Sequence, residues 1–292
     1  MSWTLYRWTW RLESSLFVGA LPAGSLNRCR LYVPSRTLWG GLTAELARRG
    51  ASDFPDYGKK GRMLLENARL TYLFPAEGDG EAWRAWLPRY EKRDGLVWRR
   101  EDRQGSEEHQ LTDRQIRRRL LGARPATAID PDSDSAEEGS LRETECVLPH
   151  WRDSGSRVAF VGYGFLKQDW REVYDITTLF LGGDTRYGLG RLQRVEWKSA
   201  SDVFGAQVDL RKEPPTVRTD RLLAHTRADG CTQEITGTRE LLAGWDRTKV
   251  DPFSALSETA LWTPGSRTRG SARTQEWSIG DNGVWESARG QT

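Results

Sequence analysis

Residues 181–192 read LGGDTRYGLGRL and run directly into an alternating segment, LQRVEW, at residues 192–197. Glycines at positions 182, 183, 188 and 190 can adopt positive φ angles and bring backbone N–H groups close to a phosphate or sugar. Arg186 and Arg191 add positive charge. The stretch therefore predicts a loop suited to holding a nucleic-acid backbone, although a plain glycine-rich hairpin with solvated arginines fits the residues equally well.

The glycine pattern matches neither of the common nucleotide-binding motifs. Gly188 and Gly190 lack the third glycine of a dinucleotide-binding turn, and the stretch precedes its strand instead of following it. The sequence contains no GxxxxGK[ST] motif either, so nothing in it indicates an ATP or GTP site.

Working outward from this loop, the sequence predicts strand, helix, strand twice over. The second set is a strand at 157–164, a helix at 171–181 and the strand after the glycines. The first set is a strand at 3–13, a helix at 36–50 with Ser35 as N-cap and Gly50 as stop, and a strand at 68–74. This order predicts an α+β, modified ferredoxin-like (RRM-type) domain with insertions.

The segments between and after these two sets are less regular. A short helix is expected at 81–90, a second helix at 111–121 and a strand at 141–148. Residues 1–200 are assigned to this ferredoxin-like domain, with an insertion around 123–146, and residues 201–292 to an accessory β-rich or irregular C-terminal region. Pro214 and Pro215 fall early in that polar region.

Charge is distributed in blocks along the chain. The formal net charge is only +3, but residues 1–50 contain seven arginines and two glutamates. Residues 114–124 contain five arginines, and residues 130–145 contain seven acids. Alternating blocks of this kind favour a polyanion-binding surface beside protein interfaces, while a solvated helix followed by an acidic loop explains any one block equally well.

Cysteines and hydropathy restrict the setting of the protein. Cys29, Cys146 and Cys231 lie far apart without a CxxC motif, so the sequence indicates neither a disulfide framework nor a zinc site. No metal and no cofactor are expected. No apolar run approaches 18 residues and the N-terminus lacks an unbroken apolar segment, which favours the cytoplasm and no membrane partner.

Three separated motifs resemble segments of one protein family. Residues 30–42, RLYVPSRTLWGGL, resemble the yIPGSSLKGxLR helix start of the RAMP superfamily, the RNA-binding subunits of CRISPR effector complexes. Residues 123–145, with ARPATAID, AEEGSL and Glu145, are similar to the R-x-x-x-A-I-D … A-x-E-G-x-L-F-x-x-E segment of type III members. Residues 182–191 look like the glycine-rich loop of the family. Each motif is moderately specific, and their shared order strengthens the resemblance.

The resemblance implies sites as well as a fold. In the family the first helix and the glycine loop lie near each other and hold the guide RNA. Around residues 123–146 the family extends a thumb-like hairpin toward the guide and target duplex or the next subunit. The implied RNA-binding residues are Arg28, Arg30, Ser35, Arg36, Thr37, Gly183, Arg186, Tyr187, Gly188, Gly190 and Arg191. The implied thumb-like residues are Arg124, Ile129, Asp130, Glu138, Gly139 and Leu141. The implied partners are crRNA, target RNA and other CRISPR effector subunits.

The same resemblance argues against catalysis. Type III backbone subunits cut target RNA with an aspartate ahead of the first helix, but residues 20–31, ALPAGSLNRCRL, contain Asn27 and no Asp or Glu. An amide neither binds a divalent metal as a carboxylate does nor acts as a base. The expected function is a non-catalytic guide-RNA-binding subunit, either the cap that holds the 5′ handle or an inactive backbone subunit. The alternatives are a guide-processing endoribonuclease using His109, His150 or His225, and a stand-alone RNA-binding module.

Overall fold

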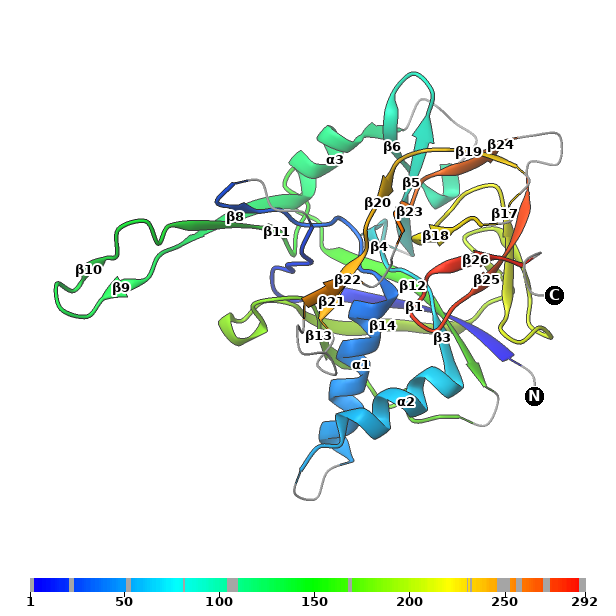
Figure 1. Cartoon of the computed structure of the whole chain (residues 1–292), viewed down its shortest axis with the longest axis horizontal. Helices are drawn as coiled ribbons and strands as arrows, with labels where there is room; N and C mark the ends of the chain where they lie inside the picture. Colours follow the sequence, from blue (N-terminus) through cyan, green and yellow to red (C-terminus); the bar gives the residue numbers. More distant parts are fainter. Residues whose placement is uncertain are drawn as a thin grey trace.

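The computed structural model describes most of the chain (Figure 1). The described residues are 3–20, 24–50, 54–80, 82–103, 110–167, 170–229, 231, 233–245, 253–255, 259–269 and 274–288. Strands dominate them. The helices are α1 (Ser35–Arg49), α2 (Tyr57–Asn67) and α3 (Asp113–Leu120), with short 3-10 turns at η1 (Glu101–Arg103) and η2 (Thr185–Tyr187).

One sheet organises residues 3–199, and its strand order is β13-β14-β1-β12-β4-β5-β6-β7, with β3 also paired to β12. Around its centre, β1 lies between β12 and β14, and β12 lies between β1 and the β3/β4 pair; every one of these pairings is antiparallel. This is the ferredoxin-like order, with the first strand between the third and the fourth. The α+β, modified ferredoxin-like prediction is confirmed. The bounds are β1 (Trp3–Leu12), β3 (Ala68–Leu70), β4 (Phe74–Gly78), β5 (Trp83–Glu91), β6 (Gly95–Arg100), β7 (Leu111–Thr112), β12 (Val158–Lys167), β13 (Thr178–Phe180) and β14 (Arg191–Ser199).

Tryptophans of the first strand fill the core beside this sheet. Trp8 and Trp10 are fully buried, and Trp8 pairs with Gly162 across the β1–β12 ladder. The next glycine on that face, Gly164, makes room for the indole, because a Cβ there would lie 2.9 Å from the Trp8 ring. An indole of this size buries a large apolar area, so this fit anchors the centre of the fold.

A long hairpin projects from the main body (Figure 1). Its two arms pair from Leu121 opposite Val147 to Ala126 opposite Arg142, and again near the tip, where residues 129–130 pair with residues 135–136. A short parallel strand from the loop before α1 joins its base. The bounds are β2 (Leu26–Asn27), β8 (Leu121–Ala126), β9 (Ile129–Asp130), β10 (Ser135–Ala136) and β11 (Arg142–Val147).

Residues after 201 form short strands that pack against the first part of the chain. Val217, Trp277 and Trp285 are fully buried in the same hydrophobic cluster as Trp8, so the core is continuous across the sequence boundary at residue 200. The strands are β15 (Asp202–Val203), β16 (Ala206–Asp209), β17 (Thr216–Thr219), β18 (Thr226–Arg227), β19 (Glu234–Thr236), β20 (Arg239–Glu240), β21 (Ala243–Trp245), β22 (Phe253–Ala255), β23 (Leu261–Trp262), β24 (Arg267–Arg269), β25 (Gln275–Ile279) and β26 (Trp285–Ser287).

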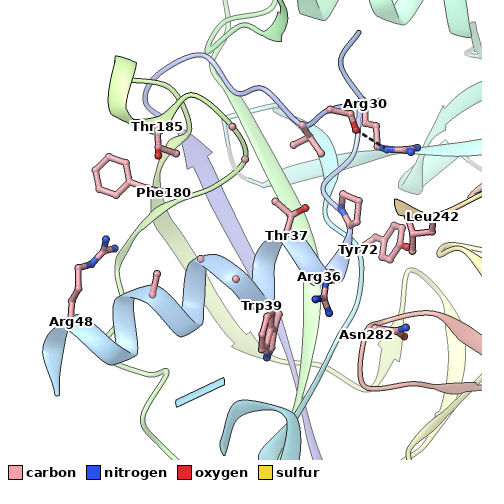
Figure 2. Close-up of a pocket in the computed structure, with 18 residues that line it drawn as sticks. Arg30, Arg36, Thr37, Trp39, Arg48, Tyr72, Phe180, Thr185, Leu242 and Asn282 are labelled. Carbon is pink, nitrogen blue, oxygen red and sulfur yellow. Dashed lines mark hydrogen bonds between the residues drawn. The ribbon is translucent and has the colours of Figure 1, made fainter. Parts of the chain in front are cut away.

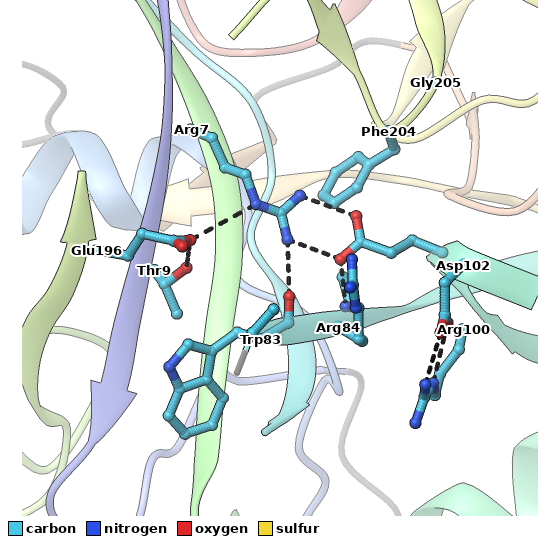
Figure 3. A network of polar contacts seen from close by, with 12 residues as sticks. Arg7, Thr9, Trp83, Arg84, Arg100, Asp102, Glu196, Phe204 and Gly205 are labelled. Carbon is cyan, nitrogen blue, oxygen red and sulfur yellow. Dashed lines mark hydrogen bonds and ion pairs between the residues drawn. The ribbon is translucent and has the colours of Figure 1, made fainter. Parts of the chain in front are cut away.

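A buried arginine joins several parts of this core (Figure 3). The guanidinium of Arg7 donates two hydrogen bonds, of 2.8 and 2.7 Å, to the carboxylate of Glu101 and one of 3.0 Å to the Trp83 carbonyl. Its Nη1 also donates to the hydroxyl of Tyr163, which in turn accepts the N–H of Phe204 at 3.1 Å. Because these partners come from β5, η1, β12 and the β15–β16 turn, Arg7 fastens the C-terminal region to the sheet.

Three local predictions are wrong. Residues 171–181 form turns and the edge strand β13 instead of a helix, because Ile176 and Leu179 are drawn into the core beside β14. Residues 81–90 were expected to be helical, but β5 pairs with both β4 and β6, as its aromatic residues favour. The N-cap of α1 is Pro34, and Ser35 is the first helical residue.

The α1 and α3 predictions are confirmed, α1 within one residue and α3 within two residues of the expected bounds. Among the residues that the structure describes, no helix combines the length and apolar character needed to span a membrane.

Candidate nucleic-acid interface

A cavity of about 670 Å³ lies between α1 and the glycine-rich stretch (Figure 2). We call it the groove. It brings together two of the sequence motifs that are separated by roughly half of the chain. Its lining residues are Val18, Gly19, Arg30, Pro34, Arg36, Thr37, Trp39, Gly40, Gly41, Ala44, Arg48, Tyr72, Phe180, Gly182, Gly183, Thr185, Leu242 and Asn282. None of these described lining residues is an aspartate or a glutamate.

Small residues on α1 form the floor of the groove. Gly40, Gly41 and Ala44 all line it. A Cβ at Gly41 would lie 2.3 Å from the Leu181 side chain and 3.1 Å from the Phe180 carbonyl oxygen. The helix and the segment entering the glycine stretch can therefore approach this closely only because position 41 carries no side chain.

Cationic side chains of α1 border the groove. The guanidinium of Arg36 lies 5.4 Å from the centre of the Trp39 ring, a cation–π contact that leaves its N–H groups available. Arg48 pairs with Glu45 one turn away on the same helix, at 3.0 Å, and its side chain is half exposed. Exposed pairs of this kind contribute little and exchange readily for a phosphate.

The glycine stretch is held by its own backbone. Gly182 and Gly190 have φ angles of +81° and +78°, and a Cβ at either would lie about 2 Å from a carbonyl oxygen (2.1 Å from Phe17, 1.9 Å from Leu181). The N–H groups of Gly183, Gly188 and Gly190 donate to Phe17, Thr185 and Ser15 carbonyls. These three amides are therefore engaged within the protein and stabilise the loop itself, while the assignment of Gly183, Gly188 and Gly190 to RNA binding stays a prediction.

The charged and aromatic side chains of Arg186, Tyr187 and Arg191 are exposed instead, whereas Leu189 is buried. Arg186, Gly188 and Arg191 are exposed, and the Tyr187 ring is 66% exposed. Because its ring is this exposed, Tyr187 does not pack in the core that the described residues form. Its role in stacking on a base stays a prediction.

The predicted RNA-binding residues before and at the start of α1 differ in whether they line the groove. Thr37 and Arg36 line the groove, whereas Ser35 is only 1% exposed, and the turn at Gly283 covers it. Arg28 is exposed beside the base of the hairpin. The guanidinium of Arg30 is already engaged by a carboxylate of the C-terminal region.

That engagement belongs to a buried cluster that the sequence did not predict. We call it the latch, and it consists of Arg30, Tyr72, His225 and Glu240. Glu240 accepts hydrogen bonds of 2.5 Å from both Arg30 Nη1 and His225 Nε2, and the Tyr72 hydroxyl lies 2.7 Å from His225 Nδ1. These partners fit a neutral histidine that donates from Nε2 and accepts at Nδ1. The latch closes the C-terminal region onto one end of the groove.

Burial and hydrogen bonding set the protonation of the latch. Burial lowers the pKa of His225, and it outweighs the opposing hydrogen bond to Glu240. For Glu240 burial by itself raises the pKa, but the hydrogen bond from His225 and the charge of Arg30 overcome it and lower the pKa to about 2. Burial also raises the pKa of Tyr72. At neutral pH the latch therefore contains a carboxylate, a guanidinium and two neutral rings.

The projecting hairpin contains all of the predicted thumb-like residues. Arg124, Glu138 and Gly139 are exposed, and Asp130 accepts hydrogen bonds from the Asp132 N–H and the Ser133 hydroxyl, which fits a turn role. Ile129 and Leu141 are 60% and 62% exposed. The contact of these side chains with RNA or with a neighbouring subunit stays a prediction.

We expect removal of the hairpin end to leave the fold intact. Replacing residues 127–141 with Asn-Gly joins Ala126 to Arg142 through a two-residue turn, and the removed residues contribute no buried side chain. The free energy of unfolding should change by less than about 1 kcal/mol, measured by urea denaturation. A loss of several kcal/mol would contradict the description of this hairpin as an appendage.

The remaining candidate catalytic residues are scattered. His225 is fully buried in the latch, and His109 lies outside the described residues. His150 is exposed and forms a backbone bridge with Arg157, the residue before β12. Asn27 lies in β2, opposite Thr144 of the hairpin base. Within the described part of the chain, no group of three or more His, Cys, Asp or Glu residues is placed to hold a metal ion.

Comparison with known proteins shows a likeness of fold. No protein-family model and no curated protein matches the chain. A chain from the cryo-EM structure of the type III-B Cmr-beta bound to cognate target RNA and AMPPnP (state 1) aligns over 90% of this chain and 85% of its own length, with a TM-score of 0.55 and 11% identity. A chain from the Cmr-beta bound to cognate target RNA aligns over 66% of this chain and 96% of its own length, with a TM-score of 0.40 and 12% identity.

Proposed function

We propose that this chain is a guide-RNA-binding subunit of a type III-like CRISPR ribonucleoprotein, and that it holds RNA in the groove without cutting it. The observation that carries the proposal is the groove itself, where the RAMP-like start of α1 and the RAMP-like glycine stretch meet. The similar fold of the chain from the type III-B Cmr-beta bound to cognate target RNA and AMPPnP supports it.

The charges and rings around the groove suit single-stranded RNA. Arg36 and Arg48 line the groove on its helix side, and Arg186 and Arg191 are exposed on the glycine stretch next to it in sequence, outside the lining itself. Phe180, which is 42% exposed, lines the groove, and Tyr187 lies nearby in sequence. Cationic groups that follow a backbone, together with exposed rings on which bases stack, are the usual means of holding a single strand. We assign the guide's 5′ handle to this groove.

The absence of catalysis is part of the proposal. Acid–base or two-metal RNA cleavage needs carboxylates or an accessible histidine near the bound phosphate. The described lining of the groove has no carboxylate, and His225 is buried with both ring nitrogens engaged. The loop that precedes α1 has Asn27 where the family pattern has an acid.

Co-purification tests the proposal. The tagged chain is expressed with the neighbouring subunits and a CRISPR array, and the bound RNA is sequenced. We expect guides that share a common 5′ handle, together with large partner proteins. A monomer without RNA or partners would contradict the proposal and favour a stand-alone module.

The endoribonuclease alternative makes a separate prediction. The purified chain is incubated with repeat RNA, with and without Mg²⁺, and the products are resolved on a gel. We expect no site-specific product. Site-specific cutting that His150→Ala or His109→Ala abolishes would establish a processing enzyme in place of a passive subunit.

A further inference from the structure

A second concentration of positive charge lies at the seam between the β5–β6 hairpin and β24, and it shares no residue with the groove. A cavity of about 430 Å³ opens there. Its lining residues are Tyr90, Glu91, Lys92, Asp220, Thr236, Arg267, Thr268 and Arg269. Three of them are cationic, and two threonine hydroxyls accompany them.

Two carboxylates hold the arginines of this cavity in place. Glu91 pairs with Arg89 at 2.5 Å and with Arg267 at 3.5 Å. Asp220 pairs with Arg267 at 3.1 Å. Both carboxylates are thus engaged by the same arginine, which fixes its planar guanidinium at the edge of the cavity.

Arg221 is the unbalanced charge of the cluster. It forms a backbone bridge with Arg267, and the Nε–H groups of both residues are buried without an acceptor among the described residues. Burial, and next the charge of Arg89, lower the pKa of Arg221 to about 10, although Asp220 opposes them. A buried guanidinium beside other guanidiniums is costly unless an anion compensates it.

We propose that this cavity is an anion site that binds a phosphate group, carried either by a small phosphorylated ligand or by a polynucleotide backbone. Guanidiniums bind phosphate oxygens through paired N–H donors. Arg267 lines the cavity, and Arg221 is its backbone neighbour outside the lining, so a phosphate held by Arg267 supplies the negative charge that the cluster lacks next to Arg221. Lys92 and Arg269 add attraction at the cavity mouth. This site is independent of the groove and of the function proposed for it.

Thermal unfolding of the full chain with inorganic phosphate tests the proposal. The measurements use an R36A/R186A/R191A background, which weakens the groove, and sodium chloride at matched ionic strength as reference. Saturating phosphate should raise Tm by about 5 °C. Arg221→Met should abolish this rise without lowering the phosphate-free Tm, because it removes a desolvated charge that Asp220 offsets only in part. Arg211→Met, at an exposed arginine of the same region, should leave the rise intact.

A rise that persists in Arg221→Met and in Arg267→Gln would overturn the proposal, and so would no rise at all. Arg267→Gln covers the case in which Arg221→Met does not fold. Titration with 5′-AMP and with an eight-nucleotide RNA then separates the sources. Tighter binding of the RNA that depends on Arg221 identifies a polynucleotide site, whereas AMP or phosphate binding alone identifies a small-ligand site.

Discussion

Gly190→Ala should lower the free energy of unfolding by about 3 kcal/mol or more and disrupt the folded conformation of the glycine stretch. Gly190 has a φ of +78°, and an added Cβ would lie 1.9 Å from the carbonyl oxygen of Leu181 and 3.0 Å from its carbon. The obstacle is backbone, which a rotamer change cannot relieve. The β13–β14 connection must open, and Arg191 moves with it. Urea denaturation measures the loss directly.

Gly188→Ala is the matched control for this change. Gly188 lies two residues earlier with a φ of +84°, and an added Cβ there meets nothing within 4 Å. The substitution should therefore cost only the left-handed backbone strain, about 1 kcal/mol. Equal losses in the two variants would contradict the close packing of Gly190 on Leu181.

The second large effect is expected at the latch. Glu240→Ala leaves Arg30 and His225 without their shared acceptor, and their side chains are only 13% and 0% exposed. Removing one partner of a buried pair typically costs about 3–5 kcal/mol. Glu286→Ala, which breaks an exposed pair with Arg227, should cost under about 1 kcal/mol. The double variant Arg30→Met/Glu240→Ala should recover part of the loss, and strictly additive effects would contradict the latch.

The latch also predicts loss of stability in acid. The folded pKa of His225 lies below its ordinary 6.5, and that of Glu240 is about 2 against an ordinary 4.5. In both cases the unfolded chain binds the proton more readily, so stability rises with pH. The contribution of His225 is complete above about pH 6.5 and falls below it, and that of Glu240 falls from about pH 4.5 toward 2. Urea midpoints from pH 7.5 to 5 should decline, and less steeply in His225→Gln.

The parts of the fold that local patterns determine could be predicted from the sequence. Alternating apolar residues indicated β1, and helical spacing with a terminal glycine indicated α1. The apolar spacing of residues 171–181 and 81–90 fits a helix and a strand equally well, so the prediction of two helices was wrong. Pairing of β13 with β14, and of β5 with β4 and β6, places strands in both segments. Short strands after residue 201 depend on partners far along the chain, which no local pattern reveals.

The site divides in the same way. The family resemblance implied that α1 and the glycine stretch lie near each other, and both line the groove. The latch was missed because Arg30, His225 and Glu240 meet only through tertiary packing and no spacing rule links them. Local glycine content suggested amides that bind a ligand, whereas the structure uses those amides to close the loop.

Salt-dependent binding of a guide-like single-stranded RNA is the most direct test of the groove. The slope of log Kd against log salt counts the phosphate contacts, at about 0.7 for each in single strands. We predict that the R36A/R186A/R191A variant binds at least tenfold more weakly than the unmodified chain, with a slope shallower by about 2. The R211A variant, altered at an exposed arginine outside the groove, should keep both values. Unchanged affinity and slope in the groove variant would contradict the assignment of RNA to this groove.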